Sequence, residues 1–232
     1  MADGAGRDDE SETVDADGTD RRDIDGTGNS DAEPQPSRPP LAIVEGRTHV
    51  ENVEDFVERI DAIATSHGVT IQAFDARSIV SRRHLERAVE LAHREHARGE
   101  GIARDPAVEI LLYAAGRRQI ERALEMGVSA GDCPAVAVVV GTDDAGRRRG
   151  ADDQEAEPDN GDRDGNADDT GTDVAGAVAA LEDELDPAET LGRYDEARVR
   201  DFFDVTDQEL AATAGTLEDA VLERVALLVV ER

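Results

Sequence analysis

Apolar residues follow two periods along this chain, one helical and one extended. Residues 53–66 carry apolar side chains at helical spacing, and Gly68 just after them marks a helix end. Residues 69–74 alternate between apolar and polar positions, which predicts a strand. The run at 135–140 is wholly apolar and too short for a helix, so it predicts a buried strand, and a further short strand is predicted at 41–44.

Capping residues predict further helices between and after these strands. Ser81 predicts the start of a helix that runs to about Arg98, and Asp105, followed by proline, opens one that ends before Gly116. A short helix is predicted over 117–126. Later helical segments are predicted near 174–185, 195–203, 206–214 and 216–227. Strands interleaved with helices predict an α/β or α+β fold, in which a single-layer sheet of few strands is covered by helices.

Two acidic stretches interrupt this pattern. Residues 1–40 contain 12 acidic and 4 basic residues, and residues 143–172 contain 11 acidic and 4 basic residues, with no apolar period in either. Such composition is typical of disordered segments. We therefore predict a disordered acidic tail over 1–38 and a single domain over 39–232, which a disordered acidic loop at 143–172 interrupts.

The charge of the whole chain suggests adaptation to high salt. The 232 residues include 55 acidic and 25 basic residues, for a net charge of −30, and every basic residue is Arg. An acidic surface spread over the chain, with Arg in place of Lys, predicts a halophilic source. At roughly 1 M salt the Debye length is about 3 Å, so net charge says little about partners and only local charge counts.

This interpretation predicts a salt-dependent stability. In dilute buffer a chain of net charge −30 repels itself, and salt screens that repulsion. The free energy of unfolding should therefore rise steeply between about 0.1 M and 1 M KCl, as screening shortens to a few Å. Thermal melting across this range measures the effect, and equal stability at both ends would contradict the halophilic interpretation.

Several classes of protein are disfavoured by the sequence. No apolar run is long enough for a membrane helix, and the acidic N-terminus lacks the features of a secretory signal, so a cytoplasmic protein is expected. No phosphate-binding glycine loop, metalloprotease motif or nucleophile elbow is present. Cys133 is expected to be a buried, inert thiol, and His93 with His96 is a weak metal candidate. We expect a protein that is not an enzyme and has no cofactor or bound metal.

Positive charge is concentrated in residues 76–124, which hold 10 Arg and 7 acidic residues. Within them, the helix predicted after Ser81 carries Arg on one face, opposite its apolar side. This stripe comprises Arg83, Arg87, Arg94 and Arg98. It is either a solvated face, on which Glu90 could pair with Arg94, or a surface that contacts a ligand.

The turn at Gly116 is the more unusual feature. The predicted helix over 117–126 places Arg117 and Arg118 in its first turn, where the helix dipole is already positive. Two cations there are unfavourable unless an anion binds, and free backbone N–H groups with Arg side chains suit an anion. The alternative is that both Arg residues pair with acidic residues elsewhere in the fold.

Residues 71–131 resemble the small kinase-binding, tRNA-binding subunit of the KEOPS complex, in a form typical of a halophilic archaeon. The residues that carry the resemblance are Gln72–Ala76, Ser81 with His84, Leu85 and Ala88, Ile102–Asp105, Glu109–Ile120, and Ala123–Val128. The apolar run at 135–140 and the final Leu222–Leu228 also fit the family. The resemblance covers about 41–142 and 173–232, and leaves out both acidic stretches.

The resemblance implies a non-catalytic subunit of a complex that installs threonylcarbamoyladenosine on tRNA. Such a subunit docks on the kinase-like ATPase of the complex and captures the single-stranded 3′ CCA end of tRNA. The implied tRNA-binding residues are Gly116, Arg117, Arg118, Gln119 and Ile120, with Arg83 and Arg87 as further contacts. Arg guanidinium groups can stack on splayed bases. The competing hypothesis is a protein-only regulator of the ATPase subunit that has no direct RNA contact.

Overall fold

The computed structural model describes residues 38–142, 172–213 and 215–230. The acidic tail predicted over 1–38 and the loop predicted over 143–172 lie outside the described residues, apart from one terminal residue of each. The described residues belong to one compact unit.

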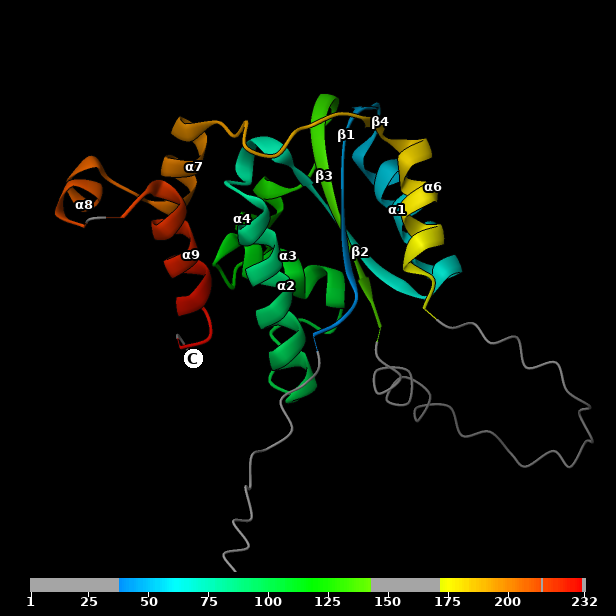
Figure 1. The fold of residues 1–232 in the computed structure, drawn as a ribbon, viewed down its shortest axis with the longest axis horizontal. Helices are drawn as coiled ribbons and strands as arrows, with labels where there is room; N and C mark the ends of the chain where they lie inside the picture. The colour runs from blue at the N-terminus through cyan, green and yellow to red at the C-terminus, as the bar shows by residue number, and fades with distance from the viewer. Residues whose placement is uncertain (1–37, 143–171, 214, 231–232) are drawn as a thin grey trace, which may run out of the picture. The chain divides into compact units, whose positions relative to one another are not determined.

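A four-stranded antiparallel sheet forms the centre of this unit (Figure 1), in the order β2-β3-β1-β4. Its strands are β1 (Leu41–Val50), β2 (Val69–Asp75), β3 (Gly131–Gly141) and the short β4 (Asp186–Pro187). The long pair is β1 with β3, which runs from Leu41 opposite Val140 to Val50 opposite Gly131. The strand predicted at 41–44 is therefore longer than expected, and β4 was not predicted.

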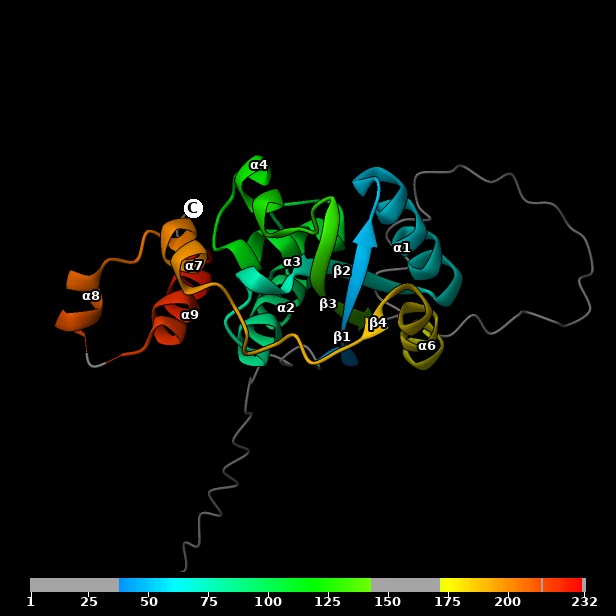
Figure 2. The ribbon, with the colours of Figure 1, turned by 90° about the horizontal axis from the view of Figure 1, so that it is seen from above.

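Helices cover both faces of the sheet, as Figure 2 shows from above. One face packs against α1 (Val53–His67) and α6 (Val174–Glu184), and the other against α2 (Arg82–Ala97), α3 (Pro106–Ala115), α7 (Glu196–Phe203) and α9 (Leu217–Leu227). A small helix, α8 (Asp207–Ala212), lies between α7 and α9 in the chain. The prediction of a mixed fold with helices covering a small sheet is confirmed.

The central strand β3 explains the wholly apolar run at 135–140. Its side chains alternate between the two faces, so Val136 and Val138 pack in one core while Ala137 and Val139 pack in the other. A strand that is buried on both faces has no solvent-exposed side, so its sequence is a continuous run of apolar residues. This arrangement confirms the buried strand predicted there.

The predicted helix starts rest on side-chain caps. The Ser81 hydroxyl accepts a hydrogen bond from the His84 N–H at 3.2 Å, and Asp105 Oδ1 accepts one from the Ala107 N–H at 2.7 Å. Each bond satisfies a backbone donor that the first helical turn leaves unpaired. Ser81 and Asp105 are therefore confirmed as N-caps.

The helix predicted over 117–126 is wrong in its start. A helical turn, α4, spans only Ile120–Ala123, and a 3-10 turn, η2, follows at Leu124–Met126. Gly116 has a positive φ of 58°, and the Arg117 N–H donates to the Leu112 carbonyl at 3.1 Å. These groups close the end of α3, so they cannot also begin the next helix.

Candidate nucleic-acid interface at the α3–α4 turn

Gly116 lies where the turn after α3 meets α9. A Cβ atom added at Gly116 would lie 3.2 Å from both the carbonyl carbon and the carbonyl oxygen of Arg224, which is tighter than ordinary contact. The positive φ of 58° further favours glycine there. The close approach fixes the turn, defined here as Gly116–Ile120, against the C-terminal helix.

Arg117 is anchored to the end of α7. Its Nη2 atom donates to the Phe202 carbonyl oxygen and, at 2.8 Å, to Oδ2 of Asp204. The guanidinium carbon lies 5.3 Å from the centre of the Phe202 ring. Arg117 is 25% exposed, and its buried Nε atom has no hydrogen-bond partner among the described residues. Arg117 thus makes an intramolecular ion pair of the kind that was the alternative to an anion site.

Arg118 is placed differently from its neighbour. Its side chain is exposed, and Nη2 donates to the Leu228 carbonyl oxygen at 3.2 Å. The Leu228 carbonyl lies at the C-terminal end of α9, where the helix dipole is negative, so a cation beside it is favourable. Within residues 38–142, 172–213 and 215–230, no carboxylate lies within 4.0 Å of Arg118 as an ion-pair partner. Most of its N–H donors therefore face solvent.

The rest of the turn presents mixed chemistry to solvent. Gln119 is exposed, and the Ile120 side chain keeps 49% of its surface accessible. The expected role of the helix dipole is corrected, because Arg117 and Arg118 precede a helix of only four residues. The exposed positive charge at the turn therefore comes from the Arg118 side chain and not from a helix dipole.

Arg83 and Arg87 belong to the first two turns of α2. They line a groove of about 500 Å³ between α2 and α9, and Arg87 pairs with Glu90 at 3.0 Å. The groove is also lined by Arg38, Glu86, Glu90, Asp219, Leu222 and Glu223. Its α9 residues, Asp219, Leu222 and Glu223, come from the first two turns of that helix, whereas Arg118 contacts the residue just past the helix end. Among the described residues, no hydrogen bond or ion pair joins Arg83 or Arg87 to the turn.

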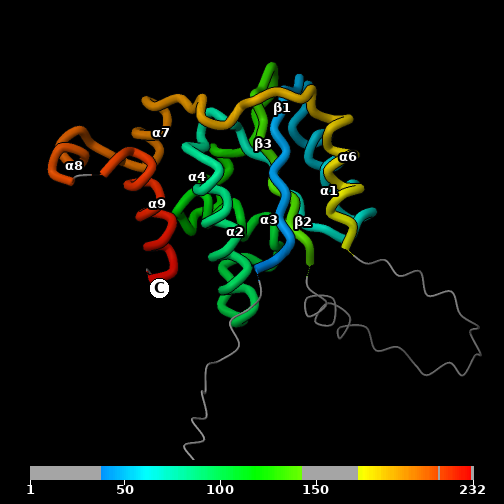
Figure 3. The backbone as a smooth tube through the Cα atoms, viewed as in Figure 1, coloured from blue at the N-terminus to red at the C-terminus, as the bar shows by residue number. Residues whose placement is uncertain are grey.

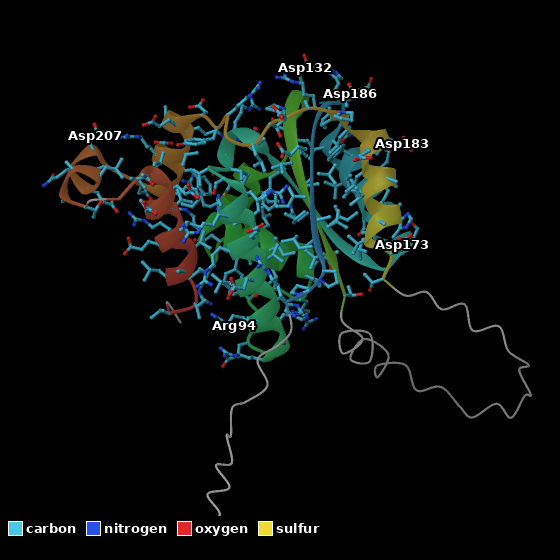
Figure 4. All side chains as sticks on the ribbon, in the orientation of Figure 1. Arg94, Asp132, Asp173, Asp183, Asp186 and Asp207 are labelled. Atoms are coloured by element: carbon cyan, nitrogen blue, oxygen red, sulfur yellow. The ribbon has the colours of Figure 1, made fainter. Side chains whose placement is uncertain are left out.

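Arg94 and Arg98, the other two residues of the Arg stripe on α2, make contacts within the fold. Figure 4 shows Arg94 on α2. Its Nε atom donates to Glu95 Oε1 at 3.0 Å, and Arg98 lies 3.4 Å from the same oxygen. Glu95 is only 1% exposed, so both cations support a buried carboxylate. This part of the stripe has a structural role in addition to its solvent contact.

Comparison with protein families decides the identity of the chain. A model of the family described as "Kinase binding protein CGI-121" matches residues 48–228, which include both layers of helices and the whole α3–α4 turn. The chain belongs to the CGI-121 family. A search of curated proteins finds no match. The CGI-121 family is a family of kinase-binding proteins rather than of catalysts, which confirms the kinase-binding part of the resemblance.

A buried carboxylate at the end of β2 was missed by the sequence argument for this CGI-121 protein. Asp75 is fully buried, and its Oδ2 atom lies 2.7 Å from Nη2 of Arg77 and 2.9 Å from Nη1 of Arg198. Arg198 also donates to the Glu125 carbonyl oxygen at 2.9 Å, beyond α4. Asp75 therefore ties the sheet to α7 and to the turn after α4. The sequence signal that could have pointed to Asp75 is its position within the segment Gln72–Ala76, which carries part of the resemblance.

His84 is a second buried polar group in the CGI-121 domain. Its Nε2 atom is 2.8 Å from the Ala114 carbonyl oxygen, and its ring packs edge-on against Phe203 with centroids 5.9 Å apart. Burial lowers the pKa of His84 from the usual 6.5 to about 4. The ring is therefore neutral at pH 7 and donates its Nε2 proton to the carbonyl.

This shift predicts a pH-dependent stability. Between pH 6.5 and about 4 the unfolded chain protonates His84 while the folded chain does not, so the unfolded state binds more protons. The free energy of unfolding should fall as pH falls through this range, by about 1.4 kcal/mol for each pH unit. Denaturation of the wild type and His84→Phe at each pH measures it. A slope that is the same in both proteins would contradict this role of His84.

Three further residues were candidates from the sequence: Cys133, His93 and His96. Cys133 is buried, and burial raises the pKa of its thiol. His93 and His96 belong to no group of three potential metal ligands in the part of the chain that the structure describes. Among the described residues, no helix has the length and apolar character needed to cross a membrane.

Proposed function

We propose that this chain is the non-catalytic subunit of a KEOPS-type tRNA threonylcarbamoyladenosine-modification complex from a halophilic archaeon. In this role it docks on the kinase-like ATPase subunit and binds the single-stranded 3′ CCA end of tRNA at the α3–α4 turn. Membership of a kinase-binding family supports the docking. The tRNA contact rests on the chemistry of the turn.

The observation that carries the tRNA proposal is the exposed Arg118 guanidinium. It faces solvent next to the exposed Gln119 amide and the half-exposed Ile120 side chain. A single-stranded RNA end offers phosphates, base faces and base edges. A guanidinium can bind a phosphate or stack on a base, an amide can read a base edge, and an aliphatic side chain can support a base face.

Arg117 has a positioning role in this proposal. Its bond to the Phe202 carbonyl and its packing on the Phe202 ring hold the start of the turn against α7, while the Gly116 contact holds it against α9. These two anchors leave Arg118 at a defined position. Arg83 and Arg87 are weaker candidates, because four carboxylates line their groove and would repel a phosphate.

The experiment is a gel shift at molar salt, with intact tRNA and with tRNA that lacks its CCA end. The Arg118→Glu variant should bind intact tRNA about tenfold or more weakly, because a charge-assisted contact becomes a repulsion. Arg104→Glu is the matched control, since Arg104 is also exposed, also has no ion-pair partner among the described residues, and lies at the opposite end of α3.

Two results would refute the tRNA proposal. One is equal binding of the two tRNAs by the wild-type chain, and the other is unchanged binding by Arg118→Glu. Either result would favour the protein-only regulator of the ATPase subunit. The specific observations that favour this second function are the intramolecular pairing of Arg117 and the acidic groove around Arg83 and Arg87.

A further inference from the structure

Asp204, the residue that follows α7, has an unusual backbone conformation. Its φ of 54° makes it the one residue other than glycine with a positive φ in the described parts of the chain. Glycine adopts this conformation without strain, whereas aspartate is only tolerated there. Termination of the helix therefore does not explain why a carboxylate stands at this position.

The carboxylate of Asp204 contacts Arg117. Oδ2 lies 2.8 Å from Nη2, yet the Asp204 side chain is 77% exposed while Arg117 is 25% exposed. The two partners are therefore held unequally. Arg117 has a second anchor in the Phe202 carbonyl and packs on the Phe202 ring. The Asp204 carboxylate is largely exposed, so water can replace Arg117 as its hydrogen-bond partner.

The pairing leaves part of the guanidinium unsatisfied. Asp204 accepts from Nη2, and the buried Nε atom has no acceptor among the described residues. An anion that accepts from both atoms would satisfy the guanidinium better, in the two-point geometry that phosphates and carboxylates share. Arg117 belongs to the Gly116–Ile120 turn, so such an anion would lie on the α7 side of the proposed tRNA site.

We propose that Asp204 is an intramolecular competitor at this site, and that a phosphate of the bound RNA end displaces its carboxylate from Arg117. This inference rests on the proposed function of the turn. The carboxylate keeps Arg117 paired in the unbound protein and lowers the affinity for RNA. Only an RNA end that reaches the turn removes it, so Asp204 selects against weak contacts elsewhere along a nucleic acid.

The test is Asp204→Asn, which removes the charge and keeps a residue that tolerates a positive φ. At molar salt the variant should bind intact tRNA about three- to fivefold more tightly than the wild type, the range of an exposed ion pair. Binding of tRNA without its CCA end should not change. Asp207→Asn is the matched control, because it removes the same charge from an exposed carboxylate on α8 that pairs with Arg200 on α7, and Figure 4 labels Asp207.

The outcomes separate this inference from the proposed function. If Asp204→Asn binds no more tightly than Asp207→Asn while Arg118→Glu loses binding, the competitor role is wrong and the tRNA site stands. If Asp204→Asn gains affinity equally for both tRNAs, the carboxylate acts through general charge and the inference is also wrong. If neither the wild type nor Asp204→Asn binds tRNA, both proposals fail.

Discussion

Replacing Asp75 by alanine should lower the free energy of unfolding by roughly 2–4 kcal/mol. The fully buried carboxylate accepts from the Arg77 backbone N–H at 3.0 Å and from the guanidinium groups of Arg77 and Arg198. Its removal leaves two partly buried cations without their anion. Because both guanidinium groups are about a third exposed, water offsets part of the loss, and the expected loss extends below the range for fully buried pairs.

Chemical denaturation at molar salt measures this effect. Asp132→Ala is the matched control, since Asp132 belongs to β3 but its side chain is 94% exposed and pairs only with the exposed His49 among the described residues. We expect little change in that variant, because surface ion pairs contribute little. A loss in Asp75→Ala no larger than in the control would mean that the Asp75 network does not hold α7 to the sheet.

The second large effect distinguishes the two neighbouring arginines. Arg117→Glu should destabilise the protein by about 2–3 kcal/mol, because it leaves the Phe202 carbonyl without its donor and places a carboxylate opposite Asp204. Arg118→Glu should cost less than about 1 kcal/mol, because it loses a single exposed contact to a carbonyl.

Thermal melting of the two variants under the same salt provides the comparison. Arg117→Met is the companion variant, because it keeps a long side chain over Phe202 and adds no negative charge, so its loss should be smaller than that of Arg117→Glu. Equal stability of Arg117→Glu and Arg118→Glu would show that the Arg117 contacts contribute nothing. The distinction also matters for binding, since a loss in an Arg117 variant can reflect a displaced turn.

The parts of the fold that local patterns describe were predictable from the sequence. The caps at Ser81 and Asp105 and the wholly apolar β3 each follow from a short run of residues. The two-residue β4 and the polar second half of β1 were not predictable, because their pairing depends on a partner strand rather than on their own pattern.

The candidate site was predictable in position but not in its contacts. The turn after Gly116 was found from its charge and from the resemblance. The partner of Arg117 is Asp204, which lies 87 residues further along the chain, and no local pattern connects the two. The start of α4 was misplaced for a related reason, since the backbone of Gly116 and Arg117 is used to end α3.

The strand order has a consequence for how the protein forms. Figure 3 shows the chain passing from β2 through α2 and α3 before it returns as β3. β1 and β2 follow each other in sequence but do not pair with each other, because β3 lies between them, and Leu41 meets Val140 across 99 residues. No local hairpin can seed the sheet, so it cannot assemble before residues 131–141 have been synthesised. A topology with such distant pairings is expected to fold slowly, with the helices α2 and α3 in contact before any strand is paired.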